Sequence, residues 1–153
     1  MKRTLLLFFM LSVATVSLAD VAGNVASALG MTKEEVQTCF NKANVTLDDL
    51  MKIDEISEDR LQTMDFDDSA LKAGCFFACL YQKKAMIIGA PVNMDQIKEI
   101  IHSDKGIEPN LLAKILQIHD TCANQVKSIT NECKKILKYI LCSRYEMERT
   151  YYQ

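Results

Sequence analysis

The stretch Cys75-Phe76-Phe77-Ala78-Cys79 decides the fold, because it places two cysteines four positions apart within an apolar segment. Leu, Ile, Met, Lys and Glu recur along the chain at spacings of three and four, and alternating β-branched runs are absent, which favours helices over strands. On a helix, residues four apart have Cβ atoms about 5 to 6 Å apart, whereas a disulfide needs about 3.8 Å. We therefore expect Cys75 and Cys79 to bond to different partners.

The chain holds four further cysteines, which are Cys39, Cys122, Cys133 and Cys142. An even number of cysteines favours three disulfides over free thiols, provided that the chain is exported from the cell. The intervals between them lack the short paired spacing of a zinc site, so we predict no metal. Cys133 and Cys142 are nine residues apart and fall on opposite faces of a helix, so they too need separate partners. Excluding both pairs leaves ten of the 15 possible pairings open.

Residues 1–19 have the form of an export signal. A basic start is followed by an apolar run from Leu5 to Val16, and small residues precede a cleavage point expected after Ala19. The apolar run is shorter than the roughly 20 residues that a membrane span requires. We therefore predict a signal peptide over 1–19, one helical domain over 20–153, and a secreted protein.

The charge balance and the missing motifs exclude several functions. Cleavage removes two positive charges and no negative one, so the formal net charge changes from -2 to -4. An acidic chain without a basic, aromatic-rich patch is not expected to bind nucleic acid. The sequence contains no nucleophile elbow and no zinc-helix motif, and its cysteines are assigned to disulfides. We predict neither an enzyme nor a bound cofactor.

Local signals predict an all-α fold of about six helices, over 22–42, 46–53, 68–86, 93–103, 109–126 and 130–148, with a break near Gly30 as an alternative for the first. The predicted helix starts combine a capping residue with a polar residue three positions on, or a proline in the first turn. These starts are Thr32 with Glu35, Thr46 with Asp49, Asn93 with Gln96, and Pro109. The charged run Asp54–Arg60 is interpreted as a solvated connection.

The chain has six cysteines in a helical pattern behind an export signal, with three residues between Cys75 and Cys79 and eight between Cys133 and Cys142, and this pattern resembles a known family. The chain resembles the six-cysteine insect odorant-binding proteins, which include the pheromone and general odorant-binding proteins. This resemblance implies helices around an apolar cavity, stapled by three interlocked disulfides. It also implies one pairing among the ten, which is Cys39 with Cys79, Cys75 with Cys133, and Cys122 with Cys142.

The resemblance further implies a secreted carrier that binds and solubilises a small hydrophobic ligand. The expected ligand is an alcohol, ester, aldehyde, fatty acid or terpenoid, and a membrane receptor or a second copy of the chain are further candidate partners. The alternative from another class is a secreted helical interaction protein, or a venom or saliva component, that acts through its surface.

Candidate pocket residues come from the apolar faces of three predicted helices and from methionines, which adapt to varied ligand shapes. They are Met51, Met64, Phe76, Phe77, Leu80, Met86, Leu112, Ile115, Leu116, His119, Ile136, Leu137 and Ile140. The competing interpretation is ordinary core packing. Tyr81, Tyr139 or His119 offers a hydrogen bond to a ligand oxygen.

Two further features lie at the surface in this interpretation. Asn44-Val45-Thr46 is a glycosylation sequon, with Asn44 as the acceptor. The segment from Ser143 to Gln153 follows the last cysteine, and we expect either a lid over the cavity or a frayed helix end.

Overall fold

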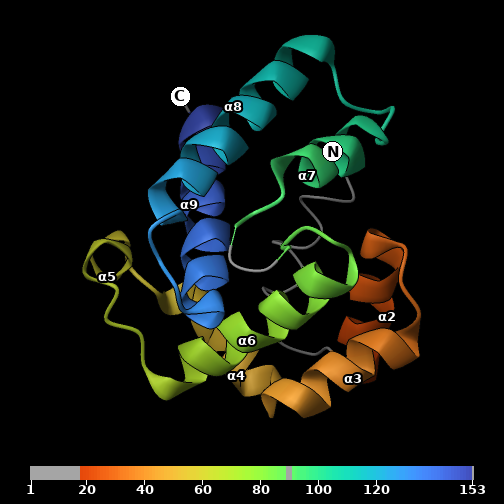
Figure 1. The fold of residues 1–153 in the computed structure, drawn as a ribbon, viewed down its shortest axis with the longest axis vertical. Helices are drawn as coiled ribbons and strands as arrows, with labels where there is room; N and C mark the ends of the chain where they lie inside the picture. The colour runs from red at the N-terminus through yellow and green to blue at the C-terminus, as the bar shows by residue number, and fades with distance from the viewer. Residues whose placement is uncertain (1–17, 89–90, 153) are drawn as a thin grey trace.

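A computed structural model describes residues 18–88 and 91–152, and every regular element in this part of the chain is helical (Figure 1). The elements are α2 (Leu18–Leu29), α3 (Lys33–Ala43), α4 (Leu47–Met51), the 3-10 helix η2 (Lys52–Glu55), α5 (Glu58–Thr63), α6 (Asp68–Lys83), α7 (Met94–His102), α8 (Pro109–Val126) and α9 (Glu132–Tyr152). The all-α prediction is confirmed. The predicted export signal lies outside the described residues except for Leu18 and Ala19, which begin α2. No described helix is long and apolar enough to cross a membrane.

The predicted caps define the first helices. The Thr32 hydroxyl accepts the Glu35 backbone N–H at 3.2 Å, and the Glu35 carboxylate accepts the Thr32 backbone N–H at 2.9 Å. Thr46 and Asp49 form the same reciprocal pair at the start of α4. Gly30 has a φ of 63°, which ends α2, so the predicted helix over 22–42 is divided in two.

The end of α6 differs from the prediction. We expected a helix over 68–86, but α6 ends at Lys83, and Ala85 adopts a left-handed φ of 55°. The Asn93 side chain holds this turn, because its amide donates to the Ala85 carbonyl at 2.9 Å. Its amide oxygen also accepts the Gln96 N–H, which is the predicted cap of α7. The Asn93 side chain thus stabilises both the turn after α6 and the first turn of α7.

Most of the run Asp54–Arg60 is solvated as expected, but the interpretation of this run as a mere connection is wrong. This run forms the end of η2 and the start of α5, and both are held against α9 by ion pairs. The Arg144 guanidinium lies 2.6 Å from the Asp54 carboxylate, and Arg149 pairs with Glu58. A short helix with so many charges lacks an apolar stripe of its own, so the sequence pattern concealed it.

The last helix is longer than predicted. We expected it over 130–148, whereas α9 spans Glu132–Tyr152 and packs against α5. The Tyr145 hydroxyl of α9 also donates to the carbonyl of Ile56, which lies between η2 and α5. Residues 143–152 are therefore the ordered end of α9, and the expected frayed end is wrong.

Two helices, α6 and α9, lie at the centre of the packing. α6 contacts α9, α3 and α4, and α9 also contacts α8 and α5 (Figure 1). Disulfides join the same helices, since Cys39 bonds to Cys79, Cys75 to Cys133, and Cys122 to Cys142. This is the pairing that the resemblance implies. The bridges link α3 to α6, α6 to the start of α9, and α8 to α9.

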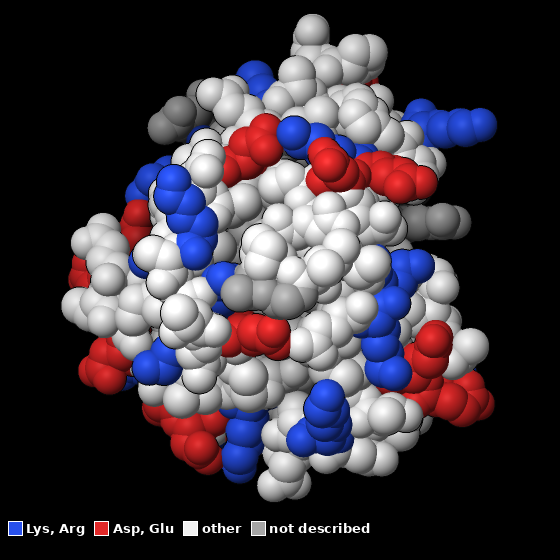
Figure 2. Space-filling view, in the orientation of Figure 1, with Lys and Arg blue, Asp and Glu red and all other residues white. Residues whose placement is uncertain are grey.

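Charged side chains cover the outer faces of these helices. Figure 2 shows Lys and Arg interspersed with Asp and Glu around a central area that is largely uncharged. Some pairs connect neighbouring helices, such as Lys98 of α7 with Asp120 of α8 at 3.3 Å. The helices are thus amphipathic, with their apolar faces turned toward one another.

Candidate ligand site

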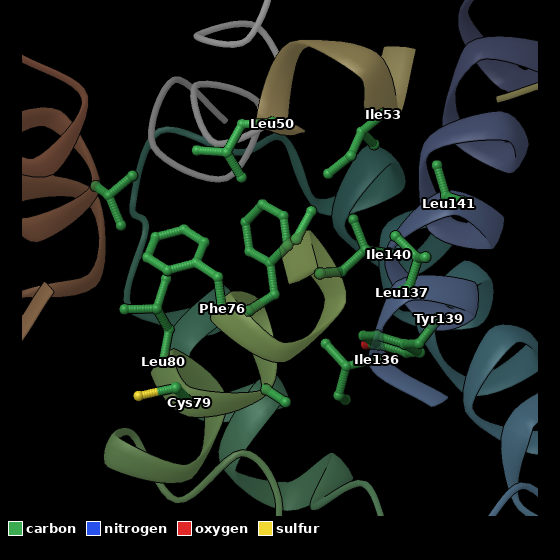
Figure 3. Packing of buried hydrophobic residues seen from close by; sticks show 14 of the residues in the cluster. Leu50, Ile53, Phe76, Cys79, Leu80, Ile136, Leu137, Tyr139, Ile140 and Leu141 are labelled. Carbon is green, nitrogen blue, oxygen red and sulfur yellow. The ribbon is translucent and has the colours of Figure 1, made fainter. Parts of the chain in front are cut away.

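The candidate site is the apolar region where α6, α8 and α9 converge. Most of the predicted pocket residues are buried in the hydrophobic core of the molecule, and His119 is buried beside them: Phe76, Phe77, Leu80, Met86, Ile115, Ile136, Leu137 and Ile140 belong to this cluster, with Leu112 and Leu116 half-buried against it. Figure 3 shows Ile136 and Ile140 on α9 pointing toward α6, where Phe76 lies. Met51 is 37 % exposed at the end of α4, and Met64 ends α5. These two methionines lie outside the cluster.

Residues of other helices, which were not among the predicted pocket residues, complete the cluster. Phe40 of α3 stacks on Phe76 with ring centroids 4.3 Å apart. Val25 of α2 and Ile101 of α7 are buried in the same cluster. The sequence held a signal for the α2 residue, since Val21, Val25 and Leu29 recur at intervals of four residues, which is typical of a buried helix face.

A separate hollow of about 300 Å³ lies at the connection between α6 and α7. Its lining comes from one short segment, made of Ile88 and the five residues from Pro91 to Asp95. None of the thirteen predicted pocket residues lines it, so this hollow is distinct from the candidate site.

Three polar rings meet inside the apolar region, one from each helix. The Nδ1 atom of His119 on α8 lies 2.6 Å from the Tyr139 hydroxyl on α9. Tyr81 of α6 meets Tyr139 edge to face, with ring centroids 6.2 Å apart. We call these three residues the tyrosine–histidine cluster. His119 is 5 % and Tyr139 1 % exposed, so their contact is shielded from water.

Burial sets the protonation of this cluster. It raises the pKa of both tyrosines, Tyr81 and Tyr139, so both phenols are neutral at physiological pH. Burial also lowers the pKa of His119 to about 4, and the neighbouring Asp120 carboxylate opposes only part of this shift. The cluster is therefore an uncharged set of hydrogen-bonding groups within an apolar wall.

The buried, neutral His119 predicts a pH-dependent stability. Its pKa is about 4 in the folded protein, against 6.5 for a solvated histidine, so between these values the unfolded chain binds a proton that the folded chain does not. The contribution is complete above pH 6.5 and is lost as the pH falls toward 4, by about 3 kcal/mol at about 1.4 kcal/mol per pKa unit. Urea unfolding at about pH 7 and about pH 4.5 measures this loss.

Two variants isolate the contribution of His119. His119→Phe is expected to lose less free energy of unfolding than the unmodified protein between these pH values. His102→Gln, which changes an exposed histidine at the end of α7, serves as the control and is expected to behave as the unmodified protein does. Equal losses in His119→Phe and the unmodified protein would contradict the assignment.

Comparison of the sequence with known proteins identifies relatives of this chain. A model of the PBP/GOBP family matches residues 24–146, from within α2 to within α9. The pheromone-binding protein Gp-9 of Solenopsis globularia littoralis is 29% identical over 129 residues, which cover 84% of this chain and 81% of that protein. The proteins of the same name from Solenopsis xyloni and Solenopsis richteri are 25% identical, with 84% and 83% covered. No solved structure matches the chain significantly.

Proposed function

The chain belongs to the PBP/GOBP family and is a carrier of small ligands, and we propose that it is secreted and holds a largely apolar molecule where α6, α8 and α9 converge. The observation that carries this proposal is the apolar character of that region, within which the neutral side chains of His119 and Tyr139 are buried in hydrogen-bonding contact. An alcohol, ester, aldehyde, fatty acid or terpenoid matches such a region. The action is burial and release, with no bond made or broken.

The energetics of this action set the expected affinity. Burial of about ten methylene groups contributes roughly 8 kcal/mol, at about 0.8 kcal/mol each, before the cost of association. The remaining free energy corresponds to dissociation constants of about a micromolar or weaker. A cavity for such a ligand would cost stability in proportion to its volume, and the three disulfides would offset such a cost.

Fluorescence displacement tests the proposal on the refolded chain 20–153 with its disulfides formed. The apolar probe N-phenyl-1-naphthylamine is titrated first, and candidate alcohols, esters, aldehydes, fatty acids and terpenoids then compete for its site. We expect saturable probe binding that at least one class displaces. Binding that does not saturate, or that no competitor displaces, would exclude the carrier function.

A filling substitution locates the site. Ile140 lies on α9 and is 6 % exposed within the cluster, so Ile140→Trp is expected to occupy ligand space and to weaken probe binding by about tenfold or more, or about 1.4 kcal/mol. Met51→Trp adds the same ring to the exposed end of α4 and is the matched control, with unchanged binding expected. Circular dichroism confirms that both variants fold. Equal affinity of the two variants would place the ligand elsewhere.

We also propose that export leads to glycosylation at Asn44. Asn44 is exposed at the end of α3 with a φ of 50°, clear of the packed helix faces. Mass spectrometry of the protein secreted from insect cells, before and after N-glycosidase, is expected to show a mass loss that Thr46→Ala abolishes. An identical mass before and after the enzyme would refute the modification.

A further inference from the structure

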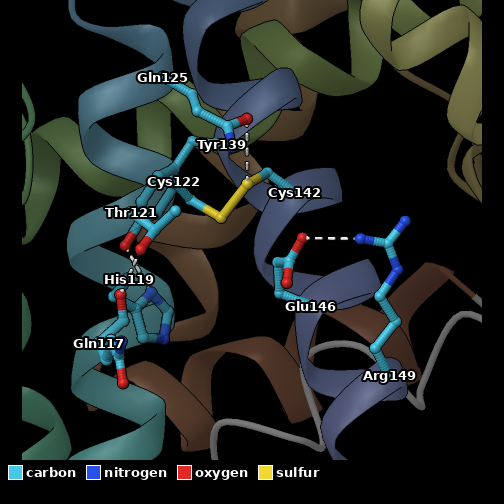
Figure 4. The surroundings of a disulfide bond; sticks show 9 residues. All are labelled: Gln117, His119, Thr121, Cys122, Gln125, Tyr139, Cys142, Glu146 and Arg149. Carbon is cyan, nitrogen blue, oxygen red and sulfur yellow. Dashed lines mark hydrogen bonds and ion pairs between the residues drawn. A yellow bond between two sulfur atoms is a disulfide. The ribbon is translucent and has the colours of Figure 1, made fainter.

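We propose that the Nε2 atom of His119 selects ligands that carry a neutral oxygen, and favours a hydroxyl over a carboxylate. The inference rests on the proposed carrier function and assigns the polar end of the ligand to one atom. Figure 4 shows where this atom lies, on α8 one turn before Cys122, whose disulfide joins α8 to α9.

The first step is that only one of the two ring nitrogens of His119 has a hydrogen-bond partner among the described residues. Nδ1 contacts the Tyr139 hydroxyl at 2.6 Å, whereas Nε2 is fully enclosed and has no hydrogen-bond partner among the described residues. Buried polar atoms in folded proteins are almost always paired, with the protein, with ordered water or with a bound molecule. Tyr139 engages the other nitrogen of the His119 ring, and no described side chain reaches Nε2, so a water molecule or a bound ligand is the expected partner of this atom.

The second step is the chemistry of that partner. When the Tyr139 hydroxyl donates to Nδ1, Nε2 carries the proton and needs an acceptor such as a hydroxyl, carbonyl or ester oxygen. When Nδ1 donates instead, Nε2 accepts and needs a hydroxyl donor. A hydroxyl group satisfies both arrangements. A hydrocarbon satisfies neither and leaves the atom unpaired.

The third step concerns charge. The histidine is neutral at physiological pH, so it gives no ion pair to a carboxylate. The charged group that acts on it is the Asp120 carboxylate, which also acts on Tyr139. Lys98 pairs with Asp120 at 3.3 Å from the α7 side. A second carboxylate buried here would meet repulsion and lose its hydration, which disfavours a fatty-acid anion relative to the matching alcohol.

Three ligands with the same alkyl chain test the inference at about pH 7: octan-1-ol, 1-fluorooctane and octanoate, each competing with N-phenyl-1-naphthylamine. We expect the unmodified protein to bind octan-1-ol about tenfold more tightly than either of the others. In His119→Phe, which keeps an aromatic ring and removes Nε2, the ratio of octan-1-ol to 1-fluorooctane affinity is expected to fall toward one. Ile115→Val, one turn earlier on α8, is the matched control and is expected to weaken both ligands alike.

A spectroscopic measurement on the unmodified protein does not depend on any variant. The ¹⁵N resonance of the His119 Nε2 atom is expected to shift when octan-1-ol saturates the protein and to stay in place with 1-fluorooctane. Probe binding without preference among the three ligands, or an unmoved resonance, would overturn the inference and leave the carrier function standing, with a water molecule as the partner of Nε2. Absence of displaceable probe binding would instead refute the proposed function itself.

Discussion

Gly74→Ala is expected to destabilise the protein by about 3 kcal/mol or more, because the backbone of α9 leaves no room for a side chain at this residue of α6. A Cβ atom at Gly74 would lie 2.4 Å from the Cys133 carbonyl oxygen and 3.1 Å from the Cβ of Leu137. The carbonyl belongs to the backbone, so it cannot rotate away as a side chain does. The adjacent Cys75–Cys133 disulfide also prevents the two helices from separating. Urea unfolding, followed by circular dichroism, measures the loss.

A second helical glycine provides the matched control. A Cβ at Gly23 of α2 would meet the Cε atom of Lys33 at 3.1 Å, which is the far end of a flexible side chain. Gly23→Ala is therefore expected to leave stability unchanged or to raise it by up to about 1 kcal/mol through helix propensity. Equal free energies of unfolding for Gly74→Ala and Gly23→Ala would contradict the close contact between α6 and α9 at Gly74.

Removal of the Cys75–Cys133 disulfide is the second large effect. This bridge spans 58 residues of sequence, so its loss in the Cys75→Ser, Cys133→Ser double variant is expected to cost about 4 kcal/mol through the larger entropy of the unfolded chain. It also joins the two helices that make most of the central contacts. The free energy of unfolding in urea, relative to the unmodified protein, gives the value.

The Cys122–Cys142 bridge is the control, because it spans 20 residues. Its removal is expected to cost about 3 kcal/mol, less than the longer bridge. Mass spectrometry of partially reduced peptides checks that each double variant keeps its other two bridges. A larger loss for the shorter bridge would contradict the loop-length argument, and a Cys39–Cys75 bridge in the unmodified protein would contradict the pairing.

Much of the fold was predictable from local features. Capping at Thr32 and Thr46 depends on atoms three residues apart, so these helix starts appear in the sequence as they do in the structure. Gly30 likewise acts through its own backbone freedom. The exceptions are elements stabilised from a distance. α5 carries one buried residue, Leu61, and owes its place to ion pairs with α9 that the local pattern cannot reveal.

The candidate site likewise combines features that the sequence predicts with features that it does not. Its apolar residues were predictable, because stripes such as Ile136 and Ile140 on α9 follow from helical spacing. Tyr81, Tyr139 and His119 were each possible hydrogen-bonding groups on chemical grounds, but the sequence did not assign them to one cluster. Their meeting depends on how α6, α8 and α9 cross, and so does the isolation of Nε2.

The sequence by itself determined the all-α class, the helix starts and the residues of the apolar faces, because each depends on neighbours within about one helical turn. The number of short helices, the ordered end of α9 and the role of Gly74 were decided by tertiary structure alone. Tertiary structure also decided that Nδ1 of His119 contacts Tyr139 while Nε2 has no described partner. The physical reason is that close approach, ion pairing and burial arise between segments that are distant in sequence, as His119 and Tyr139 are.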